Sequence, residues 1–145
     1  MRRDLYTRSP KCRRLHQRRR PGASVVEFAV CAPLMVMLLL STIEATSMIY
    51  LKQSLTIAAY EGGRTAIIPG ATSAEVEADC QQVLTDRDVQ SATIDITPSN
   101  ITPVKAGNYI VVEVSAPCNA NSLFASWFYS GRTLTGRAEV MKEYD

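Results

Sequence analysis

The longest hydrophobic feature of the chain is an apolar run that follows a basic N-terminal segment. Residues 28–43 contain no charged side chain. A helix needs about 20 mostly apolar residues to cross a bilayer, and the run reaches that length if residues 23–26 and 45–50 lie at the two interfaces. We therefore predict a transmembrane helix over residues 23–50. Pro33 lies inside it and removes one backbone donor, so we expect a kink there.

After this run the apolar positions narrow to a single stripe. The stripe repeats every three or four residues and consists of Met48, Leu51, Leu55, Ala58 or Ala59, and Gly62. Such spacing is typical of a helix with one buried face. We expect the first helix to continue to Ile68 and to end at Pro69-Gly70, with Gly62-Gly63 weakening it locally.

Residues 71–86 predict a second, shorter helix. Thr72 and Glu75 have the spacing of a capping box, in which each side chain accepts a hydrogen bond from the other residue's backbone N–H. The apolar residues stand at positions i, i+4, i+7 and i+8, which places them on one face. They are Val76, Cys80, Val83 and Leu84.

The C-terminal part alternates between apolar and polar residues, as strands with one buried face do. Strands are predicted over residues 92–97, 109–114 and 132–141. Together these elements predict an α+β fold, with a long N-terminal helix, a second helix and an antiparallel sheet of about three strands. Residues 123–128 carry aromatic side chains at helical spacing. We expect them in the domain core, with a partner patch or a membrane contact as the alternatives.

The charges divide sharply along the chain. Residues 1–22 hold nine Lys or Arg and one acid, a net charge of +8. Residues 23–145 hold seven Lys or Arg and thirteen acids, a net charge of −6. Basic residues directly before an apolar helix stay on the cytoplasmic side, so the C-terminal part is predicted to be exported. Basic segments of this kind also occur as arms that bind nucleic acid. Anionic lipid headgroups lie nearer, however, and we expect no nucleic-acid partner.

Two acids border the apolar run. Glu27 stands just inside its start, where a charge is costly in a membrane and indicates a function. Ahead of it, Pro21 before Gly22 predicts an extended junction. Glu44 stands near the other border. It either marks the outer interface, which we favour, or pairs with a partner helix.

The segment around the first acid resembles the prepilin-peptidase site of type IV-like pilins, and more closely that of the TadE-like family of pseudopilins. The resemblance is carried by Gly22, Ala23, Glu27, Phe28, the run Ala32-Pro33-Leu34, Glu44 and residues 58–64. In the family a basic leader ends in glycine, a small residue follows, and an acid and then an aromatic stand at mature positions five and six. This chain departs from the pattern in its long leader and in Gly62-Gly63, where alanines are more usual.

The resemblance implies a function. A membrane prepilin peptidase would cleave between Gly22 and Ala23 and remove a leader of residues 1–22. The acid at the position of Glu27 is thought to neutralise the new α-amino group of its own chain or of a neighbour. The mature protein, with its helix over residues 23–50 and a pilin-like domain over residues 51–145, would be a minor pilin in assembly of a Flp (tight adherence) pilus.

The resemblance also implies a location and partners. The chain would cross the bacterial inner membrane once, with a cytoplasmic N-terminus and an extracytoplasmic C-terminal domain. Other pilin or pseudopilin subunits and the pilus assembly machinery would be its partners.

Two other interpretations stay open. In the first, the chain is never cleaved and serves as a single-span anchor that displays a binding domain outside the cytoplasm. In the second, it is an exported enzyme released by signal peptidase near Ala45-Thr46-Ser47. Glu44 and the length of the apolar run argue against that cleavage site.

Two of the four cysteines lie in the exported part. Cys80 is on the predicted buried face of the second helix, and Cys118 follows the strongest strand. A disulfide between them would tie helix to sheet in a compartment where disulfides persist. We predict this disulfide, with two buried free thiols as the alternative. Cys31 lies in the membrane helix, where we expect it to pack rather than react.

Residues typical of catalysis are scarce in the exported part. It contains no histidine, no glycine-rich phosphate loop and no G-x-S-x-G motif, and the only histidine of the chain, His16, lies in the leader. No Cys/His cluster has the spacing of a metal site. We therefore expect the chain to be no enzyme, to need no cofactor or metal, and to be the substrate of a peptidase.

Overall fold

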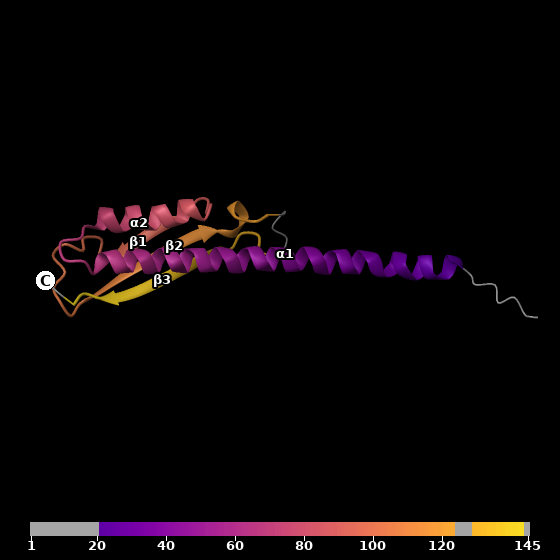
Figure 1. Ribbon diagram of the computed structural model, residues 1–145, viewed down its shortest axis with the longest axis horizontal. Coiled ribbons are helices and arrows are strands. Elements are labelled where there is room, and N and C mark those ends of the chain that lie inside the picture. The colour runs from indigo at the N-terminus through magenta and orange to yellow at the C-terminus, as the bar shows by residue number, and fades with distance from the viewer. Residues whose placement is uncertain (1–20, 124–128, 144–145) are drawn as a thin grey trace, which may run out of the picture. The chain divides into compact units, whose positions relative to one another are not determined.

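The fold is α+β, as the sequence predicts. The computed structural model describes residues 21–123 and 129–143, which divide into two compact units, one that ends at Met35 and one that begins at Val36. In chain order the elements are α1 (Pro21–Ala66), α2 (Ser73–Asp86), β1 (Thr93–Thr97), β2 (Tyr109–Pro117), the short 3-10 helix η1 (Cys118–Ala120) and β3 (Thr133–Met141). Figure 1 shows α1 and α2 on one side of the sheet in the C-terminal unit.

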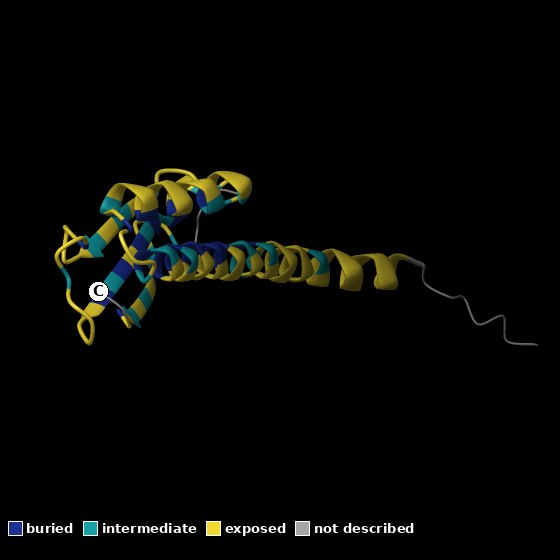
Figure 2. Cartoon of the chain, turned by 60° about the vertical axis from the view of Figure 1, so that its left-hand side comes forward, coloured by how far each residue is buried: buried dark blue, intermediate teal, exposed yellow. Residues whose placement is uncertain are grey.

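The first helix has 46 residues and continues through Pro33. Its first part, in the N-terminal unit, has exposed side chains at nearly every position, whereas one face is buried further on (Figure 2). The buried face includes Met48, Leu51 and Leu55, as the helical spacing predicts. The helix ends at Ala66, two residues before the predicted end, and Gly70 then adopts a positive φ of 81° in the following turn.

The second helix begins with the predicted capping box. The backbone N–H of Glu75 donates to Thr72 Oγ1 at 3.3 Å, and the Thr72 N–H donates to Glu75 Oε2 at 2.9 Å. These bonds satisfy two donors that a helix start leaves without partners. Of the predicted inner face, Val76, Cys80 and Leu84 are buried, and Val83 is half-buried at its border.

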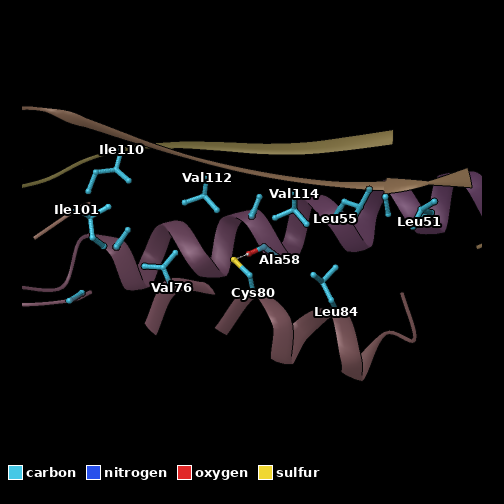
Figure 3. Packing of buried hydrophobic residues seen from close by; sticks show 14 of the residues in the cluster. Leu51, Leu55, Ala58, Val76, Cys80, Leu84, Ile101, Ile110, Val112 and Val114 are labelled. Atoms are coloured by element: carbon cyan, nitrogen blue, oxygen red, sulfur yellow. Dashed lines mark hydrogen bonds between the residues drawn. The ribbon is translucent and has the colours of Figure 1, made fainter. Parts of the chain in front are cut away.

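The sheet is antiparallel and has the order β1-β2-β3. In its register Val114 of the central strand lies between Ile94 and Gly136. Even-numbered residues of β2 are buried and odd-numbered ones are exposed or half-buried, as the period of two requires. The core thus forms between this face of the sheet and the two helices, and Figure 3 shows Val112 and Val114 directed toward α1 and α2.

Two glycines set the distances between the layers. A Cβ placed on Gly136 would lie 2.5 Å from the carbonyl oxygen of Leu55, so β3 packs directly on the backbone of α1. A Cβ on Gly62 would come closer than 3.0 Å to Cys80 Sγ, so α1 and α2 also meet at a glycine. Gly62, expected to weaken the helix, is therefore required for its packing.

The predicted Cys80–Cys118 disulfide is not formed. Both cysteines are buried free thiols. Cys80 packs against Gly62, and a Cβ built on Gly62 would lie 3.4 Å from Val112 Cγ1. The Cys80 thiol therefore lies beside the middle of β2. Cys118 comes six residues after Val112, which corresponds to about 20 Å along a strand at 3.3 Å per residue. A disulfide needs Cα atoms no more than about 7 Å apart, so the two thiols cannot join in this fold.

Some predictions fall on residues outside the described part of the chain. The predicted leader does so, apart from Pro21 and Gly22. The aromatic segment also does, apart from Leu123, which is 77% exposed.

Candidate assembly segment and its supporting domain

The cleavage junction predicted from sequence lies in a helix. Helix α1 begins at Pro21, so Gly22 and Ala23 are helical, and the expectation of an extended junction was wrong. Proline restricts the residue before it, here Arg20, and not the one after it. Its fixed φ suits the first helical position, where its missing N–H would have no partner in any case.

Ala23 and Glu27 stand one helical turn apart. Residues four apart lie on the same face of a helix, so the backbone nitrogen of Ala23 and the carboxylate of Glu27 are within reach of each other. Glu27 is exposed, and within the described part of the chain it has no hydrogen bond or ion pair. This arrangement can hold a cation of the same helix or of a neighbouring one.

The side chains around this acid are apolar and exposed. Val25, Val26, Phe28 and Val30 are between 64% and 73% exposed. Among the described residues, α1 is the one helix that is long and apolar enough to cross a membrane. Apolar residues on every face of a helix are typical of a segment surrounded by lipid or by other helices.

The hydroxyl groups at the end of the apolar run are satisfied within α1. Each donates to the carbonyl oxygen four residues earlier, at 2.8 to 3.0 Å, and the donors are Ser41, Thr42, Thr46 and Ser47. A polar group without such a bond is costly in an apolar setting. These bonds let the four residues face lipid or another helix at low cost.

Glu44 belongs to the domain. It is only 6% exposed, and its Oε1 accepts a hydrogen bond from the backbone N–H of Tyr129 at 3.3 Å. From its place in the sequence this acid was expected at the outer membrane interface, with a bond to a partner helix as the alternative. The structure instead uses this acid to fasten the segment before β3 to α1, a contact 85 residues away that the sequence gives no sign of.

Further polar contacts fasten α1 to the rest of its unit. Lys52 Nζ donates to the carbonyl oxygen of Thr135 in β3. Thr65 Oγ1 donates to Asp79 Oδ2 of α2 at 2.5 Å. The second half of α1 is thus bonded to both α2 and the sheet, and these bonds fix its position relative to them.

The two buried thiols are unsuited to chemistry. Burial, with the nearby Asp79 carboxylate as the second cause, raises the pKa of Cys80 to about 11. Its Sγ donates to the carbonyl oxygen of Ala58 at 3.3 Å (Figure 3). Burial also raises the pKa of Cys118. Because the thiolate is the reactive form, both stay inert near neutral pH. No group of three possible metal ligands occurs in the part of the chain that the structure describes.

The comparisons with known proteins bear on the helical segment. A family model described as TadE-like protein matches residues 22–64, which is most of α1. No curated protein and no solved structure matches the chain. The match indicates a minor pilin-like protein associated with the Tad pilus. The chain thus matches the TadE-like family over residues 22–64, the family that its sequence resembles.

Proposed function

We propose that this protein is a minor pilin that takes part in assembly of a Flp (tight adherence) pilus after prepilin peptidase cleaves it between Gly22 and Ala23. Its helix α1 crosses the bacterial inner membrane once and packs laterally against the helices of other pilin subunits. The observation that carries the proposal is Glu27, the single acid in the exposed apolar part of α1 (residues 22–43), one turn from Ala23.

Cleavage after Gly22 gives Glu27 a partner. A new α-amino group at Ala23 has an ordinary pKa near 8 and is mostly charged at neutral pH. It would stand at the positive end of the α1 dipole, which disfavours a cation. A carboxylate one turn away relieves this repulsion, and pairing the two charges offsets part of the desolvation penalty of each. A neighbouring chain's amino group meets the same carboxylate when helices pack side by side.

The exposed apolar surface supports lateral packing. Phe28, Val30 and Leu34 are each more than 60% exposed, and no described part of the chain covers them. In a bilayer such a helix is stable alone, but small residues allow close approach of another helix. Ala29 and Ala32 stand among the large side chains and can provide such a site.

The charge distribution supports the topology. The net charge of +8 before Ala23 and of −6 after it favour a cytoplasmic N-terminus and an extracytoplasmic domain. In this proposal the chain is the substrate of an enzyme and has a structural role of its own. The alternative is an uncleaved anchor that displays its domain, in which Glu27 would lie at the headgroups without an amino group beside it.

A complementation experiment tests the proposal. Cells that lack this chain would receive the wild type, Glu27→Gln, or Glu113→Gln as the matched control, since Glu113 is exposed on the outer face of β2. We expect the wild type and Glu113→Gln to restore pili. Glu27→Gln should enter the membrane and be cleaved but should restore few or none. Full piliation with Glu27→Gln would overturn the proposal.

A further inference from the structure

The C-terminal unit has a groove beside α1 that the assembly function does not use. It has a volume of about 750 Å³, which is within the range of small-molecule sites. One wall is the segment of α1 from Thr42 to Leu51. The opposite side consists of the turn after α2, from Arg87 to Gln90, and of residues Ala120 to Leu123 at and after the end of η1.

The α1 wall of the groove is apolar. Ile43, Tyr50 and Leu51 contribute large side chains to it. The hydroxyls of Thr42 and Thr46 donate to carbonyl oxygens of their own helix at 2.8 Å, which leaves their methyl groups for other contacts. This wall therefore suits a hydrocarbon chain better than a polar ligand.

The opposite side is held in place by hydrogen bonds. The backbone N–H of Gln90 donates to Asn121 Oδ1 at 2.7 Å, and Asn121 Nδ2 donates to the carbonyl oxygens of Gln90 and Pro117, both at 2.9 Å. The N–H of Val89 also donates to the Leu84 carbonyl at 2.9 Å. The groove is thus formed before any ligand arrives, which lowers the entropy cost of binding.

The groove presents one positive and one negative charge. Among the described residues that line it, only Arg87 and Asp88 are charged at neutral pH. The Arg87 guanidinium has no hydrogen bond or ion pair within the described part of the chain. Asp88 Oδ1 accepts a hydrogen bond from Gln90 Nε2 at 2.9 Å. A ligand with an anionic and a cationic group close together would match this pair.

The position of the groove along α1 indicates where such a ligand comes from. If the span begins at Ala23, about 20 residues bring its outer border to Ile43. The α1 wall starts at this border and extends about 13 Å beyond it at 1.5 Å per residue. That distance covers the headgroup layer of a membrane, where phosphates and amines are concentrated.

We propose that the groove binds one phospholipid with a zwitterionic headgroup that carries a primary amine, of the phosphatidylethanolamine type. Arg87 binds the phosphate, Asp88 binds the ammonium group, and the first part of an acyl chain lies along Thr42 and Ile43, at the border of the bilayer. The inference rests on the proposed function in that α1 must cross a membrane. The bound lipid would fix the height of the domain above the bilayer.

Native mass spectrometry of the full chain in detergent tests this site. The protein is first exposed to equal amounts of phosphatidylethanolamine, phosphatidylcholine and phosphatidylglycerol. We expect one retained lipid per chain, chiefly phosphatidylethanolamine. Arg87→Gln removes a charge-assisted contact to phosphate and should lower retention of all three lipids about tenfold. Asp88→Asn should remove the preference for phosphatidylethanolamine over phosphatidylglycerol, because it deletes the partner of the ammonium group.

Two controls make the result decisive. Arg64→Gln removes a cation of α1 whose side chain is 74% exposed and which does not line the groove, so lipid retention should not change. Thr46→Phe fills the groove without changing its charge and should lower retention as Arg87→Gln does. Equal retention of the three lipids, or retention unaffected by Arg87→Gln and Thr46→Phe, would overturn the inference.

Membrane fractionation separates failure of this inference from failure of the proposed function. The wild type and all variants keep the apolar run and should remain in the membrane. A chain found in the membrane without a selected lipid contradicts the lipid site alone. A chain that is absent from the membrane contradicts both proposals.

Discussion

Gly62 of α1 and Cys80 of α2 make the contact that sets the distance between the two helices of the domain. The thiol occupies the space that a side chain at Gly62 would need, and it donates to Ala58 one turn earlier in α1. A Cβ built on Gly62 would also lie 3.4 Å from Val112 Cγ1, so α1, α2 and the sheet meet at this position. A small residue in the middle of α1 thus allows both α2 and the sheet to approach.

Gly62→Ala should lower the stability of the domain. The added methyl group overlaps Cys80 Sγ, and overpacking of a core typically costs about 1–3 kcal/mol, of which the better helix propensity of alanine returns up to about 1 kcal/mol. We expect a net loss of about 1–2 kcal/mol in the free energy of unfolding. Denaturant unfolding of the full chain in detergent, followed by intrinsic fluorescence, would measure it.

A double-mutant cycle with Cys80→Ala checks the cause. If the clash with Sγ is responsible, Gly62→Ala should cost less in the Cys80→Ala background than in the wild type. Equal costs in both backgrounds would show that the two residues are not coupled.

Gly136→Ala should be more damaging. The new Cβ would lie 2.5 Å from the Leu55 carbonyl oxygen and from the Thr56 nitrogen, and backbone atoms of a helix cannot move aside as a side chain can. We expect a loss of about 3 kcal/mol in the free energy of unfolding, at the upper end of the range for overpacking. Glu139→Ala, an exposed change on the same strand, is the control and should cost much less. Similar values for the two variants would contradict close packing of β3 on α1.

The stability of the domain should fall at high pH because Cys80 is buried as a neutral thiol. Its pKa rises from 9.0 to about 11 in the folded state, so its contribution is complete below pH 9 and is lost as the pH rises to about 11. The loss is on the order of 2–3 kcal/mol. Unfolding of the wild type and of Cys80→Ala from pH 7 to pH 11 would measure it. The difference in stability between them should shrink above pH 9, whereas a constant difference would contradict the account.

Removing the Glu44 carboxylate should loosen the segment that precedes β3. Glu44→Ala leaves the backbone N–H of Tyr129 without this acceptor, and losing one partner of a buried bond costs about 1–3 kcal/mol. Glu44→Gln keeps an oxygen acceptor and should cost less. Hydrogen exchange should show faster exchange of the Tyr129 amide in Glu44→Ala than in Glu44→Gln. Unchanged exchange in both variants would mean that the bond does not hold this segment.

Local patterns account for most of the fold. The Thr72 and Glu75 pair defines the start of α2, and the alternation through β2 identifies the face that is buried. Each of these features depends on residues close together in the sequence, where spacing alone determines which side chains meet. The apolar run and its lone acid likewise predict the segment that the family match covers.

Contacts between distant residues could not be predicted in the same way. The prediction that Cys80 lies on the buried face of α2 was correct. Its position along β2 depends on how α2 is placed over the sheet, which spacing in the sequence does not determine, and the predicted disulfide to Cys118 was therefore wrong. The partner of Glu44 comes from a segment 85 residues away. Gly136 signals a close approach only when the helix that approaches it is known.

The N-terminal sequence and intact mass of the protein recovered from its native membranes test the central claim most directly. We predict a chain that starts at Ala23, which places a free amino group one turn from Glu27. A chain that starts at Met1 would contradict the account, because no amino group would stand near this acid and the protein would be an uncleaved anchor.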